Sequence, residues 1–203
     1  MANEIISGED KAWEILAGLS PQDVCRRSGA LFDEGKGAYR LDSFGKTVLI
    51  DPLKKTMAAD DPSARILLTR LVYFYRLSAL WYLVKSVETA PSGKLVKPGS
   101  LPGGDMFFKG SHVLPLGMLA NRYAEDREGF CSKARELAGK QAAYGDAAFE
   151  IPVFPRIPVT LILWLRDDEW DARADVLFDS TVTAHLPIDI IWSIAMMSIL
   201  ITA

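Results

Sequence analysis

The stretch from Ile151 to Asp189 constrains the fold of this chain more than any other. It reads IPVFPRIPVTLILWLRDDEWDARADVLFDSTVTAHLPID. A continuous apolar run over 159–165 predicts a buried strand, and the acidic residues at 167–169 predict a turn. The chain returns as a strand over 175–178. Leu186-Pro187 then opens a final helix, because proline is favoured where a helix begins. The stretch therefore predicts a two-strand unit followed by a helix.

Upstream, strands and helices alternate without the regular repeat of a parallel sheet. Short strand candidates at 30–32, 38–41 and 46–50 are separated by turns, which predicts a small antiparallel meander. Asp61-Pro62-Ser63 starts a long helix that runs to about Val87. Its apolar residues cover most of its circumference, which is typical of a central helix. The mixture indicates the α+β class.

The chain is long enough for one sizeable core. It has 203 residues, of which 49% are hydrophobic, and we predict a single domain over 1–203. A loop rich in proline and glycine at 91–104 marks the best internal boundary. It would divide the chain into 1–90 and 105–203.

Charge and cysteine content exclude several classes of protein. The net charge is −3 and no run of Lys and Arg exceeds two residues; since phosphate binding needs a basic patch, we expect no nucleic-acid partner. Cys25 and Cys131 are far apart, whereas an iron–sulfur cluster usually takes four thiolates, so we expect none on the chain's own cysteines. The first residues lack a basic region followed by an apolar core. We therefore expect no signal peptide and a cytoplasmic location.

Two apolar segments, 71–84 and 186–202, raise the question of a membrane span. Arg76 interrupts the first. The apolar run of the second is about thirteen residues after Asp189, short of the roughly twenty that a spanning helix needs. We expect no membrane span and a buried final helix. The alternative is that this apolar helix packs on a protein partner or on a second copy of the chain.

The C-terminal elements resemble, in order, those of a known family. Its members have a proline-rich lead-in, an apolar strand with tryptophan, an acidic turn, the letters L-F-D and a helix opened by L-P. The corresponding segments here are Pro155–Pro158, Leu161–Leu165 with Trp164, Asp167–Ala172, Leu177–Asp179 and Leu186-Pro187, with Leu101–Gly104 and Phe107-Phe108 matching upstream. The family is an uncharacterised one of anaerobic bacteria and archaea, often labelled iron–sulfur or unknown-function proteins. The resemblance covers roughly residues 40–195.

Some members of that family carry an N-terminal module with four cysteines that holds an iron–sulfur cluster. The module is similar to that of corrinoid iron–sulfur methyl carriers. Its cysteines are missing from this chain. The resemblance therefore implies a setting in anaerobic redox or one-carbon metabolism, near metal cofactors, and leaves the reaction open.

The only two histidines are the strongest candidates for a cofactor site. His112 and His185 each sit in a turn just before a Leu-Pro pair that opens a helix. Imidazole is a common axial ligand of haem iron and can serve the cobalt of a corrinoid similarly. We therefore predict a tetrapyrrole, haem or corrinoid, held through His185 and His112. The absence of C-x-x-C-H excludes covalent c-type haem. The alternative is that each histidine only stabilises the start of its helix.

A tetrapyrrole also needs apolar walls and cations for its carboxylates. The residues predicted for the walls are Phe107, Phe108, Trp164 and Trp192, and those predicted for the carboxylates are Lys109 and Arg156. Gly103 and Gly104 could contact an anion or cofactor through their backbone N–H groups. The alternative for this pair is a turn that requires positive φ.

The acidic turn Asp167-Asp168-Glu169 is a second candidate site. Clustered carboxylates can bind a divalent cation or act as an acid–base pair, which would make the chain a divalent-metal enzyme. A solvated turn is the favoured alternative. A third hypothesis is a non-catalytic interaction module, in which the final helix and the region 53–71 bind a partner protein.

Overall fold

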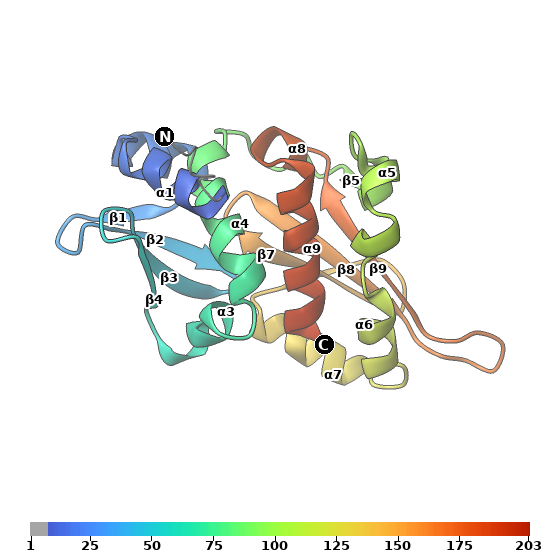
Figure 1. Cartoon of the computed structure of the whole chain (residues 1–203). Helices are drawn as coiled ribbons and strands as arrows, with labels where there is room; N and C mark the ends of the chain where they lie inside the picture. The colour runs from blue at the N-terminus through green and yellow to red at the C-terminus, as the bar shows by residue number, and fades with distance from the viewer. Residues whose placement is uncertain (1–7) are drawn as a thin grey trace.

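The structure, a computed structural model, describes residues 8–203 and has two antiparallel sheets with long helices lying in front of them in Figure 1. The first sheet has the order β1 (Leu31–Asp33), β2 (Ala38–Ser43), β3 (Lys46–Asp51) and β4 (Thr56–Ala59). The second has the order β5 (Leu95–Val96), β9 (Arg173–Asp179), β8 (Ile157–Trp164), β7 (Ala147–Phe154) and β6 (Lys140–Ala142). The α+β class and the N-terminal meander are confirmed, and the meander has a fourth strand.

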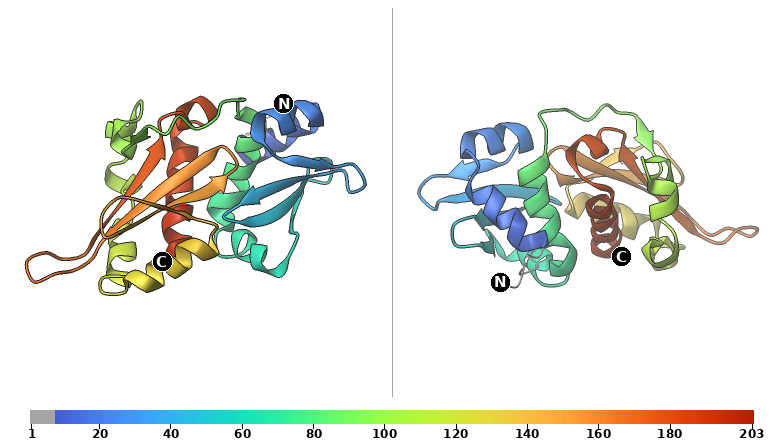
Figure 2. Two further views of the ribbon diagram at one scale, coloured as in Figure 1. Left: turned by 180° about the vertical axis from the view of Figure 1, so that it is seen from behind. Right: turned by 45° about the horizontal axis from the view of Figure 1, so that its top comes forward.

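The helices fill the space beside the two sheets. They are α1 (Gly8–Ala17), α2 (Pro21–Ser28), α3 (Arg65–Leu68), α4 (Val72–Lys85), α5 (Gly104–Phe107), α6 (Leu116–Arg122), α7 (Arg127–Glu136), α8 (Val182–His185) and α9 (Ile188–Thr202). Short 3₁₀ turns lie at Pro62–Ala64, Pro98–Ser100 and Gly110–His112. Helix α9 packs on α4, α6 and the second sheet. Seen from behind, the strands of that sheet lie in front of α9 (Figure 2).

Helix α9 is the buried core helix that its composition predicts. Most of its residues are buried, and those still partly exposed include Trp192, Met196 and Leu200. The chain's own elements therefore cover most of this apolar helix. Within residues 8–203, no helix combines the length and the apolar character that crossing a bilayer requires.

The predicted long helix from Asp61 to Val87 is interrupted. Asp61 does cap its start, because its carboxylate accepts a hydrogen bond from the Ser63 N–H at 2.7 Å. The helix stops after Leu68, where the Thr69 hydroxyl donates to the Arg65 carbonyl and the Thr69 backbone leaves the helical region. Such side-chain bonds compete with the helical ladder. The chain resumes as α4, and α9 is the longer helix.

Prolines end the β7–β8 hairpin without preventing it. The sequence predicts only the apolar strand after Pro158, yet residues 147–154 form a full strand beside it. Pro152 and Pro158 face each other across this ladder, and β9 pairs with β8 only from Val159 onward. Pro158 therefore lies where β8 has a neighbour on one side alone, so its missing N–H costs the sheet little.

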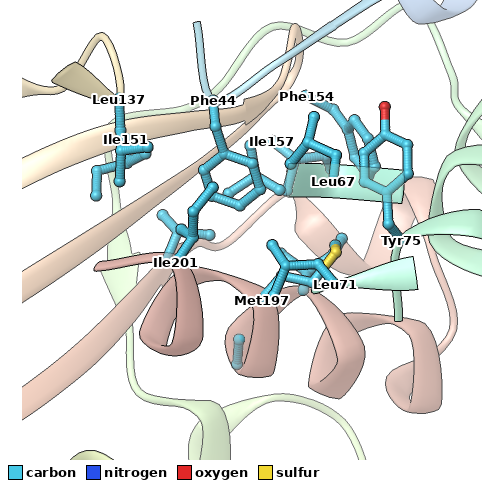
Figure 3. Packing of buried hydrophobic residues seen from close by; sticks show 14 of the residues in the cluster. Phe44, Leu67, Leu71, Tyr75, Leu137, Ile151, Phe154, Ile157, Met197 and Ile201 are labelled. Carbon is cyan, nitrogen blue, oxygen red and sulfur yellow. The ribbon is translucent and has the colours of Figure 1, made fainter. Parts of the chain in front are cut away.

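A tight turn with a buried phenylalanine joins the two sheets. Phe44 and Gly45, the two residues between β2 and β3, both have positive φ, at 54° and 70°. This is the conformation of a type I′ hairpin turn, which glycine adopts easily and phenylalanine rarely does. The Phe44 ring is fully buried near residues of the second sheet and α9 (Figure 3), and its N–H donates to the Pro152 carbonyl at 2.9 Å. Burial of the ring offsets the unfavourable backbone conformation.

Candidate functional site

A two-lobed groove between α4 and α9, here called the histidine groove, brings both histidines together. Its first lobe has a volume of about 650 Å³ and includes His185; its second has about 500 Å³ and includes His112. The lobes share four lining residues, which are Gly8, Leu77, Asp189 and Ile190. Each volume lies in the range of about 300–1,000 Å³ that is usual for small-molecule sites. Residues 73 positions apart in sequence thus line one continuous surface hollow.

In the second lobe, aromatic rings hold His112. Its half-buried imidazole stacks on Phe107, with ring centres 4.4 Å apart, and meets the edge of Trp192 at 5.2 Å. The Trp192 indole N–H donates to the His112 carbonyl at 3.0 Å, which fixes the backbone beneath the ring. No side chain or backbone group within 8–203 hydrogen-bonds to the His112 ring nitrogens. This imidazole is therefore oriented by stacking while its nitrogens stay available to a ligand.

Gly103 and Gly104 support this wall from outside the groove. Gly103 has φ of 74° and precedes α5, the short helix that carries Phe107. Gly104 is buried against the Pro98 carbonyl, which a Cβ at this position would overlap. Gly103 thus shapes the loop behind Phe107 by its positive φ, the alternative stated for this pair, whereas Gly104 permits the close approach of the Pro98 carbonyl.

His185 lies at the base of the first lobe and is almost inaccessible. Its side chain sits at the end of α8 with 1% of the residue exposed. The Val87 N–H donates to its Nδ1 at 3.4 Å, and its Nε2 has no hydrogen-bond partner within residues 8–203. A neutral imidazole whose Nδ1 accepts must carry its hydrogen on Nε2. Nε2 is therefore arranged as a donor, whereas metal ligation needs a free lone pair.

The surroundings of His185 favour its neutral form. Burial lowers the pKa of His185 below its usual 6.5, the Arg156 guanidinium lowers it further, and Asp179 acts in the opposite direction. The net effect is a pKa below the usual value. At neutral pH the ring is uncharged, which fits its apolar position.

This depressed pKa predicts acid sensitivity. Below pH 6.5 the unfolded chain binds a proton that the folded chain resists, so the free energy of unfolding falls as the pH drops from 6.5 toward the folded pKa. The slope from one group is at most about 1.4 kcal/mol per pH unit. Urea unfolding at several pH values measures it. In His185→Asn, whose amide oxygen can accept from Val87, this part of the slope should vanish. In His112→Ala it should remain; equal slopes in all three proteins would contradict the assignment.

One face of α4 forms one wall of the groove. Tyr73, Leu77, Trp81 and Lys85 recur at every fourth position and all line it, because residues four apart share one side of a helix. The Lys85 ammonium lies 5.7 Å from the centre of the Trp81 ring. From the sequence, Tyr73 and Trp81 were favoured as core residues, and the four-residue spacing that puts them on one side of the helix with Leu77 and Lys85 was not used.

Several residues predicted for the site lie outside the groove. Arg156 donates to the carbonyls of Arg27 and Arg26 at 2.6 and 3.0 Å, so it binds the end of α2. Lys109 is exposed, and Phe108 packs against the edge of the core. Trp164 lines a separate hollow, where the Arg173 guanidinium lies 4.4 Å from its ring centre. Of the predicted walls, the groove brings together Phe107 and Trp192.

The acidic turn lies in the loop between β8 and β9, which extends away from the body of the molecule (Figure 1). The Asp167 carboxylate accepts from the N–H groups of Glu169 and Trp170 at 2.9 and 2.7 Å, so it orders its own turn. Asp168 and Glu169 are exposed. Across residues 8–203, no group of three or more His, Cys, Asp or Glu side chains is arranged to hold a metal ion.

Comparison with known proteins identifies a family. The family model of a domain of unknown function, DUF3786, matches residues 20–200. No curated protein and no solved structure matches the chain. The match covers both sheets, both histidines and nearly all of the groove.

Proposed function

Because the chain belongs to the DUF3786 family, an uncharacterised family as the resemblance implied, we propose its function from the groove itself. The proposal is that the histidine groove binds a metal tetrapyrrole, haem or corrinoid, and that the protein carries the cofactor, handles it or uses it in redox chemistry. The anaerobic setting suggested by the resemblance motivates this class of ligand. The observation that carries it is the meeting of both histidines on one hollow lined by aromatic rings.

The groove suits such a ligand in three respects. His112 is an imidazole with available nitrogens, and imidazole is a common axial ligand for tetrapyrrole metals. Phe107 fixes the ring by stacking and Trp192 fixes it from the side, which reduces the freedom lost on binding. Tyr73, 83% exposed, and Trp81 provide further flat apolar surface for a macrocycle. When bound, the metal would supply the redox or alkyl-carrying chemistry.

The two histidines take different roles in this proposal. His112 faces the metal. His185 stabilises the lobe beneath the ligand, because its Nδ1 links the end of α8 to Val87 after α4. His185 is therefore not assigned as a metal ligand, although it was predicted as one from the sequence. The reason is that the hydrogen bond from the Val87 N–H to Nδ1 requires the ring hydrogen to be on Nε2.

Spectroscopy of reconstituted protein tests the proposal. Protein purified without oxygen is titrated with haem and, separately, with a corrinoid, and the shift of the absorption bands is followed. His112→Ala should weaken binding by more than about tenfold, since loss of an outer-shell partner alone can cost that much. Lys109→Gln, which changes an exposed side chain outside the groove, serves as the matched control and should keep the band shift. Absence of any shift, or a shift unchanged in His112→Ala, would refute the function.

Exposed apolar side chains beside the second lobe favour one second candidate, a protein-interaction module. Tyr73, Met106 and Val113 are 83%, 80% and 62% exposed, and Tyr73 lines the groove itself. Of the region 53–71 proposed from sequence, Leu53 is exposed, whereas Leu67 and Leu71 are fully buried. A protein-interaction module should bind no chromophore. His112→Ala would then cause no loss of ligand binding.

A further inference from the structure

The first lobe of the histidine groove contains the beginning of the longest helix. Pro187 precedes α9, and its carbonyl accepts from the N–H groups of Ile190 and Ile191. The N–H groups of Ile188 and Asp189 precede the first helical acceptor, and nothing within residues 8–203 accepts from them. A fifteen-residue helix concentrates partial positive charge at this end. Pro187, Asp189 and Ile190 all line the lobe.

A second observation at the same place points to a ligand. His185 also lines this lobe, and its buried Nε2–H has no acceptor within the described chain. A buried donor without a partner is energetically unfavourable. A carboxylate oxygen is an acceptor that such a donor can use, and His185 is among the residues that line the lobe.

Two further side chains give the lobe an anion-binding character. Lys85 is exposed at the rim and forms no ion pair with any described residue. Thr183 adds an exposed hydroxyl. In the second lobe, by contrast, the Arg76 guanidinium is paired with the Glu9 carboxylate. Among the described residues that line the groove, the unpaired cation is therefore Lys85, in the first lobe.

Asp189 acts against an anion here, since its carboxylate is exposed and borders both lobes. Its charge should repel a ligand carboxylate from the middle of the groove and so favour placement beside Lys85. Removal of the Asp189 charge should therefore strengthen the binding of an anionic ligand, and this direction can be tested.

We propose that the first lobe binds a carboxylate of the ligand through the Lys85 ammonium, the N-terminal N–H groups of α9 and the hydroxyl of Thr183, with His185 Nε2–H as the innermost donor. This inference rests on the proposed function and narrows it. The ligand is a tetrapyrrole whose rim carries carboxylates, as in haem, and one whose rim carries only amides fits less well.

Two metal-free porphyrins separate this inference from metal ligation. Protoporphyrin IX and its dimethyl ester are titrated against the full chain in the same dilute non-ionic detergent, and binding is followed by porphyrin fluorescence. We expect the acid to bind more tightly than the ester. Lys85→Gln should weaken acid binding by roughly threefold to tenfold, as expected for a partly exposed ion pair, and leave ester binding unchanged. Asp189→Asn should strengthen acid binding.

Lys109→Gln is the matched control, because Lys109 is an exposed lysine outside the groove. It should alter neither titration. If acid and ester bind equally and Lys85→Gln changes neither, the carboxylate site is refuted while tetrapyrrole binding stands. If neither porphyrin binds, and haem and corrinoid also give no band shift, the proposed function and this inference both fail.

Discussion

Replacing Phe154 by alanine is expected to lower the free energy of unfolding by about 3–5 kcal/mol. The Phe154 ring is fully buried at the end of β7, where the two sheets and the helices meet (Figure 3). It stacks on Tyr82 with ring centres 4.6 Å apart and 15° between planes, and it lies 6.2 Å from Tyr75. Truncation removes the buried apolar area, both ring contacts and the filling of a space that rigid neighbours cannot close.

Chemical denaturation in urea, monitored by far-ultraviolet circular dichroism, measures this effect. Phe154→Leu keeps most of the volume and should lose clearly less stability than Phe154→Ala. Leu53→Ala removes a side chain that is 79% exposed and should change stability by no more than about 0.5 kcal/mol. A loss below about 1 kcal/mol in Phe154→Ala would show that this ring is not part of the core that joins the sheets.

Asp179→Ala is expected to cost about 2–4 kcal/mol and to release the loop at 91–104. The Asp179 side chain is buried at the end of β9 and accepts hydrogen bonds from the N–H groups of Ser92, Gly93 and Thr181 at 3.0, 2.7 and 2.9 Å. The hydroxyls of Ser92 and Thr181 donate to it as well. Alanine would leave these donors without an acceptor. Urea unfolding measures the loss, and limited proteolysis should show new cleavage within 91–104.

The contribution of the Asp179 carboxylate to the free energy of unfolding depends on pH. Burial raises the pKa of Asp179, but the N–H and hydroxyl donors of Thr181 and the N–H groups of Ser92 and Gly93 outweigh it, so the net pKa is below the usual 3.8. This contribution to stability is therefore complete above pH 3.8 and is lost as the pH falls through the lower folded value. Asp179→Asn should lack this acid-dependent part. Lys97→Gln, which removes only an exposed partner of Asp175, is the control and should keep both the loop and the slope. An intact loop in Asp179→Ala would contradict the argument.

The fold was predictable from the sequence where local patterns decide it. Turn residues between short apolar runs located the N-terminal meander, and Leu186-Pro187 located the start of α9. The break after Leu68 was not predictable, because it depends on which carbonyl the Thr69 hydroxyl reaches. Strand β7 was not predicted because proline has no N–H to donate to a neighbouring strand. In the structure, Pro152 faces Pro158 at positions where the ladder needs no N–H donor.

The residue types of the candidate site were easier to predict from the sequence than their positions in the fold. Sequence identified His112, Phe107 and Trp192, which the groove does bring together. The sequence could not show that the Arg156 guanidinium donates its hydrogen bonds to the carbonyls at the end of α2. Nor could it show that Lys85 reaches the groove, since this depends on how α4 is rotated against α9. Residue chemistry is visible in a sequence, but the orientation of a helix is set by packing between distant segments.

The Phe44–Gly45 turn has a consequence for the order in which the chain folds. Its ring and its N–H both depend on partners more than a hundred residues later, the core around Phe154 and the carbonyl of Pro152. Such a contact has a large loop-closure cost and forms only after the later hairpin is in place. The meander can collapse early, yet its β2–β3 turn should reach native geometry late. A nascent chain ending before β7 would therefore expose an aromatic ring in a strained turn.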